Sequence, residues 1–436
     1  MHSLTGVRSG RGLRRSLRAS LTAVVVLLGL AASARAAGTL YMQGGGDGHG
    51  IGMSQYGAYG YALHGADYRF ILAHYYQGTS LSTTNPQQTV RVLLANGRSA
   101  SLRGGASAAG TGGAPVQLTP SSTYRVTRRA GRLQIQTAAG HSVATLTGPV
   151  TVSGPALQVL GHGTYRGSLQ LSATSGGVQT VNAVGLDDYV RGVVASEMPS
   201  GWAPAALEAQ AVAARTYAIT TGVGGSGYGL YDDTRSQMYG GVGAETPATD
   251  AAVAATQGQV VTYGGRPAVT YFFASSGGYT ESIQNVWTGA TPEPWLQAVP
   301  DPYDSAGGQD PYHLWSTRMS LAAAGAKLRG LVRGTLRRIV VTQRGVSGRV
   351  ISAQLVGTRG RSAVTGSQLT GALGLATTLV SFSDVSAAAA GQALHRAQST
   401  APAGTGATGG AGAPVTPVTP VTPVTVSPGA AGLGVS

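Results

Sequence analysis

The sequence predicts a mixed α/β (α+β) fold for most of this 436-residue chain. Two observations support this class. Short segments rich in β-forming residues, separated by Gly, Ser and Asn turn signals, fill residues 88–182. From residue 186 the apolar residues recur at helical spacing, and strand-like segments return further on. A chain of this length is expected to form two or three structural units.

The first 36 residues have the features of a secretory signal peptide. Several arginines precede the apolar run LTAVVVLLGLAA, and Ala34-Arg35-Ala36 provides an A-x-A cleavage site. The run is too short for a good transmembrane helix, although an uncleaved anchor is the alternative. The pair Arg14-Arg15 leaves the Sec and twin-arginine routes both open. We therefore expect a secreted or wall-associated protein.

Charge is distributed unevenly along the chain, whose formal net charge is +14. Residues 82–180 and 311–383 are basic and contain no acid, whereas residues 187–310 hold 13 of the 16 acidic residues. Such basic flanks attract polyanions, and for an exported bacterial protein the abundant ones are anionic wall polymers and lipid headgroups. Nucleic acid is not expected as a partner. A merely solvated cationic surface is the alternative.

The order of elements follows from these patterns. After a Gly-rich N-terminal block (37–87) and the β-rich subdomain (88–182), a core over 183–385 begins with two helices. The first is LDDYVRGVVASEM, in which Leu186, Tyr189, Val190, Val193 and Val194 share one face. The second, PAALEAQAVAARTYAI, has a proline near its first position. The tail (386–436) contains the repeat VTPVTPVTPVTV and is expected to be disordered.

Glu197 is the first candidate for chemistry. It follows an apolar helix and precedes Met198, Pro199 and Trp202, so burial would raise its pKa and suit a general acid. An exposed loop glutamate, or a cap for the next helix, is the alternative.

Polar residues on the alanine-rich second helix are further candidates. Arg215 would orient a carboxylate or bind a substrate oxygen, or would pair with Asp187 or Asp188, and Tyr217 would stack on a sugar ring. Ser275 and Ser276 lie in a Gly-bent loop that lacks the G-x-S-x-G pattern of a serine nucleophile.

No metal or cofactor is expected. The eight histidines are scattered without metal-ligand spacing, and the chain has no cysteine. The stretch GGGDGHGIGMSQYGAYG lacks the GK[ST] of a phosphate-binding loop. Its glycines indicate left-handed turns and close backbone approach. His49 within it is either a substrate-facing group or a hydrogen-bonded structural residue.

The longer motifs together resemble the SpoIID/LytB domain family of bacterial sporulation and cell-wall remodelling proteins. The resemblance is carried by LDDYVRGVVASEMPSGWAPAALEAQAVAARTYA, TRSQMYGGVGAETPATDAAVAATQGQVVTYGGRPAVTYFFASSGGYTESIQNVW, PWLQAVPDPYD and GHGIGMSQYGAYGYALHGADYRFILAHYYQGTSL. It covers roughly residues 41–380 and implies a catalytic core with an inserted β-rich subdomain.

The resemblance also implies a function. Sporulation members are lytic transglycosylases that cleave MurNAc–GlcNAc bonds of peptide-denuded glycan strands, leaving 1,6-anhydroMurNAc ends. Their catalytic glutamate lies in the SEMP motif, which falls on Glu197 here. Other members are described as enhancers of wall amidases, which makes a non-catalytic peptidoglycan-binding enhancer the alternative. Taking the residues and the resemblance together, we expect substrate to be bound by His49, Ser54, Gln55, Tyr56, Gln210, Arg215, Tyr217, Gln237, Ser275, Ser276 and Trp287.

Two departures from the family bear on these expectations. The GHGIGMSQYGA block commonly lies near the end of the domain, whereas it comes first here, so it must return in space to lie near Glu197. Some members hold zinc through Cys and His near the SSGG region, but that region has neither residue here.

Overall fold

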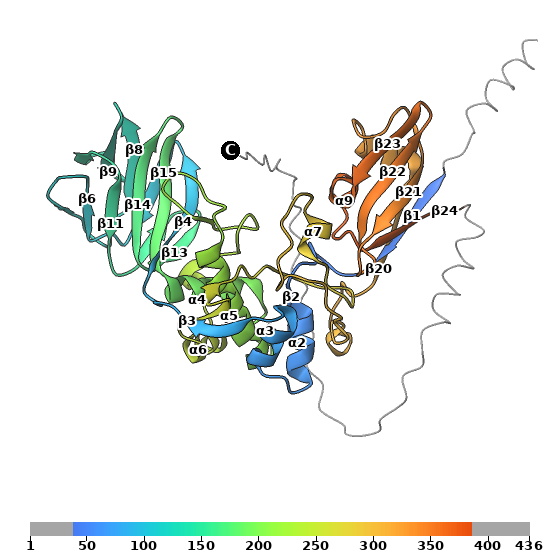
Figure 1. Ribbon diagram of the computed structural model, residues 1–436. Coiled ribbons are helices and arrows are strands. Elements are labelled where there is room, and N and C mark those ends of the chain that lie inside the picture. The colour runs from blue at the N-terminus through green and yellow to red at the C-terminus, as the bar shows by residue number, and fades with distance from the viewer. Residues whose placement is uncertain (1–37, 386–436) are drawn as a thin grey trace, which may run out of the picture.

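The computed structural model describes residues 38–385, which contain eight α-helices and several separate sheets. The mixed α/β class expected from the sequence is confirmed. The expected signal peptide (1–36) and tail (386–436) lie outside the described residues. None of the helices in the described part is long and apolar enough to cross a membrane. Figure 1 shows a β-rich unit, a helical core and a smaller α/β unit side by side, with the helical core in the middle.

The β-rich unit is a sandwich of two sheets whose apolar faces meet. Along β8 the side chains of Tyr124 and Val126 are buried and that of Arg125 is exposed, which is the alternation expected of a strand covered on one face. One sheet has the order β10 (Ser142–Leu146), β9 (Arg132–Thr137), β8 (Tyr124–Arg129), β5 (Ser99–Arg103), β12 (Leu157–Val159) and β13 (Gly163–Tyr165). The other has the order β16 (Leu230–Tyr231), β4 (Thr89–Gly97), β15 (Gly177–Gly185), β14 (Ser168–Thr174), β11 (Val150–Ser153), β6 (Ser107–Ala109) and β7 (Val116–Gln117).

The helical core is built around α5 (Pro204–Thr220), whose alanines allow close approach by its neighbours. Pro204 occupies its first turn, as expected, and the five apolar residues expected on one face of α4 are all buried. The other helices are α2 (Gln55–Leu63), α3 (Tyr68–Tyr75), α4 (Leu186–Glu197), α6 (Pro247–Ala255) and α7 (Ile283–Val286). Short strands complete the core: β2 (Met53–Ser54), β3 (Ser80–Thr83), β17 (Gln259–Tyr263), β18 (Arg266–Pro267) and β19 (Phe272–Phe273).

The range 183–385, expected as one core, contains two hydrophobic cores in the structure. From Trp315 onward the apolar side chains pack on one another and on Leu40 and Met42 of the N-terminal strand. Within residues 38–385 they do not pack on the helical core around α5. We call this unit, residues 38–44 together with 315–385, the C-terminal module. Its elements are β1 (Thr39–Gly44), β20 (Trp315–Ser320), α8 (Leu321–Lys327), β21 (Leu336–Arg344), β22 (Val350–Gly357), β23 (Gly360–Thr365), α9 (Gly366–Leu373) and β24 (Val380–Val385).

The N-terminal segment connects two of the three units. Strand β1 lies between β20 and β24 of the C-terminal module, and the chain then crosses to the helical core, where α2 and α3 pack on α5. This path is the blue ribbon in Figure 1. The Gly-rich block between β1 and α2 is therefore held at both ends.

Candidate functional site

Glu197 is the last residue of α4. The helix ends there because Met198 adopts an extended conformation with φ −127° and ψ 144°, as expected of a residue that precedes a proline. Leu186, Tyr189 and Val193 anchor the helix because their side chains are buried. The carboxyl group is thereby placed where α4 meets the N-terminus of α2 and the loop around Met238.

The environment of Glu197 raises its pKa. Burial is the largest cause, and two hydrogen bonds that stabilise the carboxylate oppose it without cancelling it. The backbone N–H of Met238 donates to Oε1 over 2.7 Å, and the amide of Gln55 donates to Oε2 over 3.3 Å. The residue as a whole is partly exposed. The carboxyl group therefore keeps its proton to a higher pH than an ordinary glutamate does.

Gln55 reaches Glu197 across 142 positions of sequence because the Gly-rich block turns sharply. Gly46, Gly48, Gly50 and Gly52 all have positive φ. At Gly52 a Cβ atom would lie 2.1 Å from the carbonyl oxygen of Tyr271, so a larger residue cannot fit. Strand β2 pairs with β19 directly after this turn, and α2 begins with Gln55.

Ser54 fixes the start of α2. Its hydroxyl oxygen accepts from the N–H of Gly57 as the helix N-cap, and its O–H donates to Asp304 over 2.8 Å. Asp304 is fully buried and also accepts from Ser275 Oγ, the N–H groups of Ser276 and Gly277, and His313 Nδ1. This set of bonds, which we call the Asp304 network, joins the SSGG loop, α2 and the loop around His313.

The charges of the Asp304 network are strongly perturbed. Burial opposes ionisation of Asp304, but the hydrogen bonds from His313, Ser276 and Ser54 outweigh it and hold its pKa at about 2. The pKa of His313 is raised, chiefly by its hydrogen bond to Asp304. Burial raises the pKa of Asp310 to about 6 and that of Asp301 to about 7. Asp304 is therefore firmly ionised, whereas the neighbouring Asp301 and Asp310 keep their protons to higher pH.

Within the described residues, Asp304, Asp310 and His313 form a cluster of side chains of the types that bind metal ions. Their ligand atoms lie within 4.8 Å of one another. Both oxygens of Asp304 already accept hydrogen bonds, and the five donors use the lone pairs that a cation would need. The arrangement fits an internal ion pair better than a metal site.

His49 lies among aromatic rings. Its ring centroid is 5.4 Å from that of Phe273, 5.5 Å from that of Trp287 and 6.2 Å from that of Tyr271. Nδ1 accepts a hydrogen bond from the N–H of Ile51 over 3.0 Å. Burial, and then the charge of Arg349, lower its pKa to about 4, so the ring is neutral near pH 7. The surroundings match the alternative of a hydrogen-bonded structural histidine.

Aromatic side chains surround the N-terminus of α2. The ring of Tyr56 lies 4.9 Å from that of Trp202 and 6.2 Å from that of Tyr312, and Trp202 stacks on Tyr59 at 4.6 Å. Tyr56 and Trp202 are partly exposed, and Tyr312 is 40% exposed. Aromatic faces of this kind suit contact with the apolar faces of sugar rings.

Several residues expected to bind substrate are instead buried. Arg215 is fully buried and donates to Asp187 over 2.5 Å, which is the ion pair considered as its alternative. Ser275 and Ser276 are fully buried, and Ser275 belongs to the Asp304 network. These three side chains cannot touch a ligand in this conformation, because the packing of the core covers them.

Two glutamines and a tyrosine from the same set lie on or against α5. Gln210 is fully buried and its amide has no hydrogen-bond partner among the described residues. Gln237 donates to the hydroxyl oxygen of Tyr189 and to the carbonyl of Ala214. Tyr217 is 7% exposed, and its ring lies 5.9 Å from that of Tyr271.

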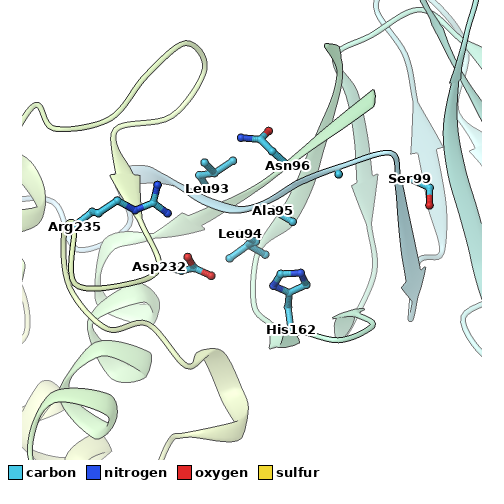
Figure 2. Close-up of a pocket in the computed structure, with 9 residues that line it drawn as sticks. Leu93, Leu94, Ala95, Asn96, Ser99, His162, Asp232 and Arg235 are labelled. Carbon is cyan, nitrogen blue, oxygen red and sulfur yellow. The ribbon is translucent and has the colours of Figure 1, made fainter. Parts of the chain in front are cut away.

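A polar cavity of about 440 Å³ is lined by residues of β4 together with His162, Asp232 and Arg235. Figure 2 shows the carboxylate of Asp232 and the ring of His162 on one side of β4, with Arg235 reaching in from the loop. Arg235 is held by Asp233, with a 2.8 Å hydrogen bond, and lies over the ring of Tyr231. The same loop leads three residues on to Met238, which donates to Glu197. The cavity thus borders the site without including its carboxyl group.

Sequence reasoning missed three contributions to this site. The N–H of Met238 is invisible to it because a backbone donor carries no residue signature. The link between Asp304 and Ser54 spans 250 positions, and no local pattern indicates it. The spacing of the histidines gives no indication that His313 pairs with the carboxylate of Asp304.

Comparison with known proteins agrees with the central part of this description. Residues 174–263 match the family model described as "SpoIID: Stage II sporulation protein". The chain is 42% identical over 144 residues to the Stage II sporulation protein D of Bacillus subtilis (strain 168), covering 29% of this chain and 41% of that protein. It is 39% identical over 142 residues to the protein of the same description from Bacillus amyloliquefaciens, with 29% and 41% covered.

A third relative bears a different description. The chain is 41% identical over 103 residues to the amidase enhancer of Bacillus subtilis (strain 168), covering 24% of this chain and 14% of that protein. The chain therefore spans about two fifths of the length of the sporulation proteins and a smaller share of the amidase enhancer. The matched residues include α4, α5 and Glu197. The resemblance predicted from the central motifs is confirmed, and the chain contains a SpoIID family domain.

Proposed function

We propose that this protein remodels peptidoglycan as a lytic transglycosylase, with Glu197 as the general acid and then the base. The observation that carries the proposal is the state of this carboxyl group. Burial raises its pKa, and its hydrogen-bond partners are an amide and a backbone N–H rather than a second carboxylate. A carboxyl group that holds its proton toward neutral pH meets the requirement for a general acid.

The proposed reaction needs only one carboxyl group. Glu197 donates its proton to the glycosidic oxygen while the bond between that oxygen and C1 of MurNAc breaks. The 6-hydroxyl of the same MurNAc then bonds to C1, and the ionised Glu197 accepts the proton of that hydroxyl. The products are a 1,6-anhydroMurNAc end and a new GlcNAc 4-hydroxyl, and no water is consumed. Most glycoside hydrolases instead require two carboxyl groups.

The aromatic residues beside Glu197 support a glycan substrate. Tyr56 follows Gln55 directly, and it contacts Trp202, which lies five positions after Glu197. Sugar rings stacked on these faces would lie next to the carboxyl group. We propose peptide-denuded glycan strands as the substrate, and the cell wall, after secretion, as the location.

The decisive experiment is digestion of purified, peptide-free glycan strands followed by mass spectrometry of the ends. We expect 1,6-anhydro ends with the wild type and a loss of at least about 1,000-fold in rate with Glu197→Gln, which keeps the shape but cannot donate the proton. Glu208→Gln is the matched control. It makes the same chemical change at a different carboxyl group, which lies on α5 near Arg69. Reducing ends without anhydro sugars, or equal activity in Glu197→Gln, would contradict the proposal.

The likeness to the amidase enhancer favours a second candidate function, a non-catalytic module that binds peptidoglycan and stimulates a wall amidase. In that case the protein alone would leave glycan strands intact. Wall solubilisation by an added amidase would rise in its presence, and Glu197→Gln would stimulate the amidase as well as the wild type does.

A further inference from the structure

The C-terminal module is strongly basic, with Asp384 as the one acidic residue in its sequence. Between residues 311 and 383 there are nine arginines and one lysine but no aspartate or glutamate. The module has its own hydrophobic core, so these cations lie on a folded unit. A surface of this kind attracts anions over distances set by ionic screening.

Five of the arginines gather at one end of the three-stranded sheet β21–β22–β23. Arg338 pairs with Val356 across one strand boundary, and Val356 pairs with Arg361 across the next. Side chains of directly paired residues point to the same face of a sheet, so Arg338 and Arg361 share a face about 10 Å apart. We define the arginine patch as Arg333, Arg337, Arg338, Arg359 and Arg361.

The turns next to this row bring in the remaining members. The N–H of Arg359 donates to the carbonyl of Arg333 over 3.1 Å, which places the two backbones side by side. Arg337 lies beside Arg338 at a β-bulge in the register with β22. The patch therefore combines three separate segments of the module.

The patch is exposed and unpaired. All five side chains are exposed, and none of them takes part in an ion pair with residues 38–383. The exposed arginines near the acidic part of the chain behave differently, since Arg166 pairs with Glu245 and Arg235 pairs with Asp233. Like charges at about 10 Å repel one another at low salt, and a bound polyanion would relieve that repulsion.

The composition of the patch favours one kind of partner. Guanidinium groups form paired hydrogen bonds with phosphate oxygens, which ammonium groups cannot do with the same geometry. Leu314 and Val346, the exposed large apolar residues of this region, lie outside the patch, so it offers no apolar wedge for a lipid surface. A row of cations about 10 Å long suits a linear chain of phosphate charges.

We propose that the arginine patch is a docking surface for a linear phosphodiester polyanion. The sheet that carries the patch stands apart from α4 in Figure 1, so a polymer held there leaves Glu197 open. The proposal does not depend on the chemistry assigned to Glu197. It describes how the protein is retained on an anionic matrix, whether or not it cuts glycan.

The test is binding of the full chain to poly(glycerol phosphate) of defined length, titrated over a range of salt concentrations. The patch variant is Arg338→Gln with Arg361→Gln, and the control is Arg128→Gln with Arg129→Gln on β8, which removes the same charge from another exposed strand. We expect the patch variant to bind about tenfold more weakly and the slope of log K against log salt to fall by about 1.4, from about 0.7 for each lost phosphate contact. The control should stay within about twofold of the wild type.

Three outcomes would overturn the proposal. The first is an equal loss in both variants, which would attribute binding to net charge. The second is tighter, patch-dependent binding to phosphatidylglycerol vesicles than to the polymer, which would identify a membrane surface. The third is no measurable binding by the wild type at about 0.05 M salt, where such contacts are strongest. Glycan cutting, measured in parallel on soluble strands, should be equal in all variants and reports separately on Glu197.

Discussion

At the scale of single residues, the pKa of Glu197 is set by two opposing influences, burial and a pair of hydrogen bonds. Burial raises its pKa, while Met238 and Gln55 lower it by stabilising the carboxylate. Removing the amide donor in Gln55→Ala therefore raises the pKa of Glu197 further. If Glu197 is the general acid, as we propose, it must be protonated, and activity is lost as pH rises through this pKa. We expect the alkaline limb of the pH–rate profile to move to higher pH.

The measurement is the initial rate of glycan cutting from pH 4 to pH 9. Gln87→Ala, which changes an exposed glutamine far from Glu197 in sequence, should leave the limb in place. A downward shift in Gln55→Ala would mean that the amide does not stabilise the carboxylate as its position suggests.

Arg215 is expected to matter for folding and not for substrate affinity. It is fully buried and bonded to Asp187, which also accepts from the N–H of Gly258. Arg215→Met would leave a buried, unpaired carboxylate and cost about 3–5 kcal/mol of the free energy of unfolding, measured with urea. Replacing both partners, Arg215→Met with Asp187→Leu, should recover part of this loss. An increased KM with unchanged stability would restore the substrate-binding interpretation.

At the scale of elements, the start of α2 connects the Asp304 network to Glu197. Ser54→Ala removes both the N-cap of α2 and a donor to Asp304, and is expected to cost about 1–2 kcal/mol. It should also lower activity by more than this loss explains, because Gln55 is the next residue. Thr365→Ala removes the N-cap of α9 in the C-terminal module and is the matched control. Equal activity at equal loss of stability would show that the position of α2 is unimportant.

The elements of the central core could be predicted because their signals are local. Helical spacing identified the buried face of α4, and Pro204 marked the start of α5. The partners of Ser54 and Gln55 could not be predicted from periodicity, since they depend on contacts 250 and 142 positions away. The nearness of the Gly-rich block to Glu197 followed only from the family resemblance.

At the scale of the whole molecule, the sequence indicated two of the three units more clearly than the third. The β-rich unit alternates β-formers and turns, and the helical core has its periodicity. The C-terminal module is completed by β1, which precedes its other strands by more than 270 residues. Pairing between such distant strands depends on the tertiary fold, so the sequence alone predicts a single core over residues 183–385.

The buried carboxyl groups near Asp304 make the stability of the molecule depend on pH. Burial raises the pKa of Asp310 to about 6, above the ordinary value near 4 expected in the unfolded chain. The folded protein therefore binds more protons between these values, and stability falls as pH rises through about 6. Asp310→Asn removes this ionisation while keeping an acceptor for the N–H of Tyr312.

We expect Asp310→Asn to gain about 1–3 kcal/mol relative to the wild type between pH 4 and pH 8. Urea unfolding at both pH values measures the change, and Asp67→Asn, an exposed carboxyl group at the start of α3, is the control for net charge. The opposite sign, a variant that loses stability relative to the wild type as pH rises, would mean that charged Asp310 stabilises the fold. In that case the carboxylate would be held by its bonds to Ser275 and Tyr312 more strongly than burial opposes it.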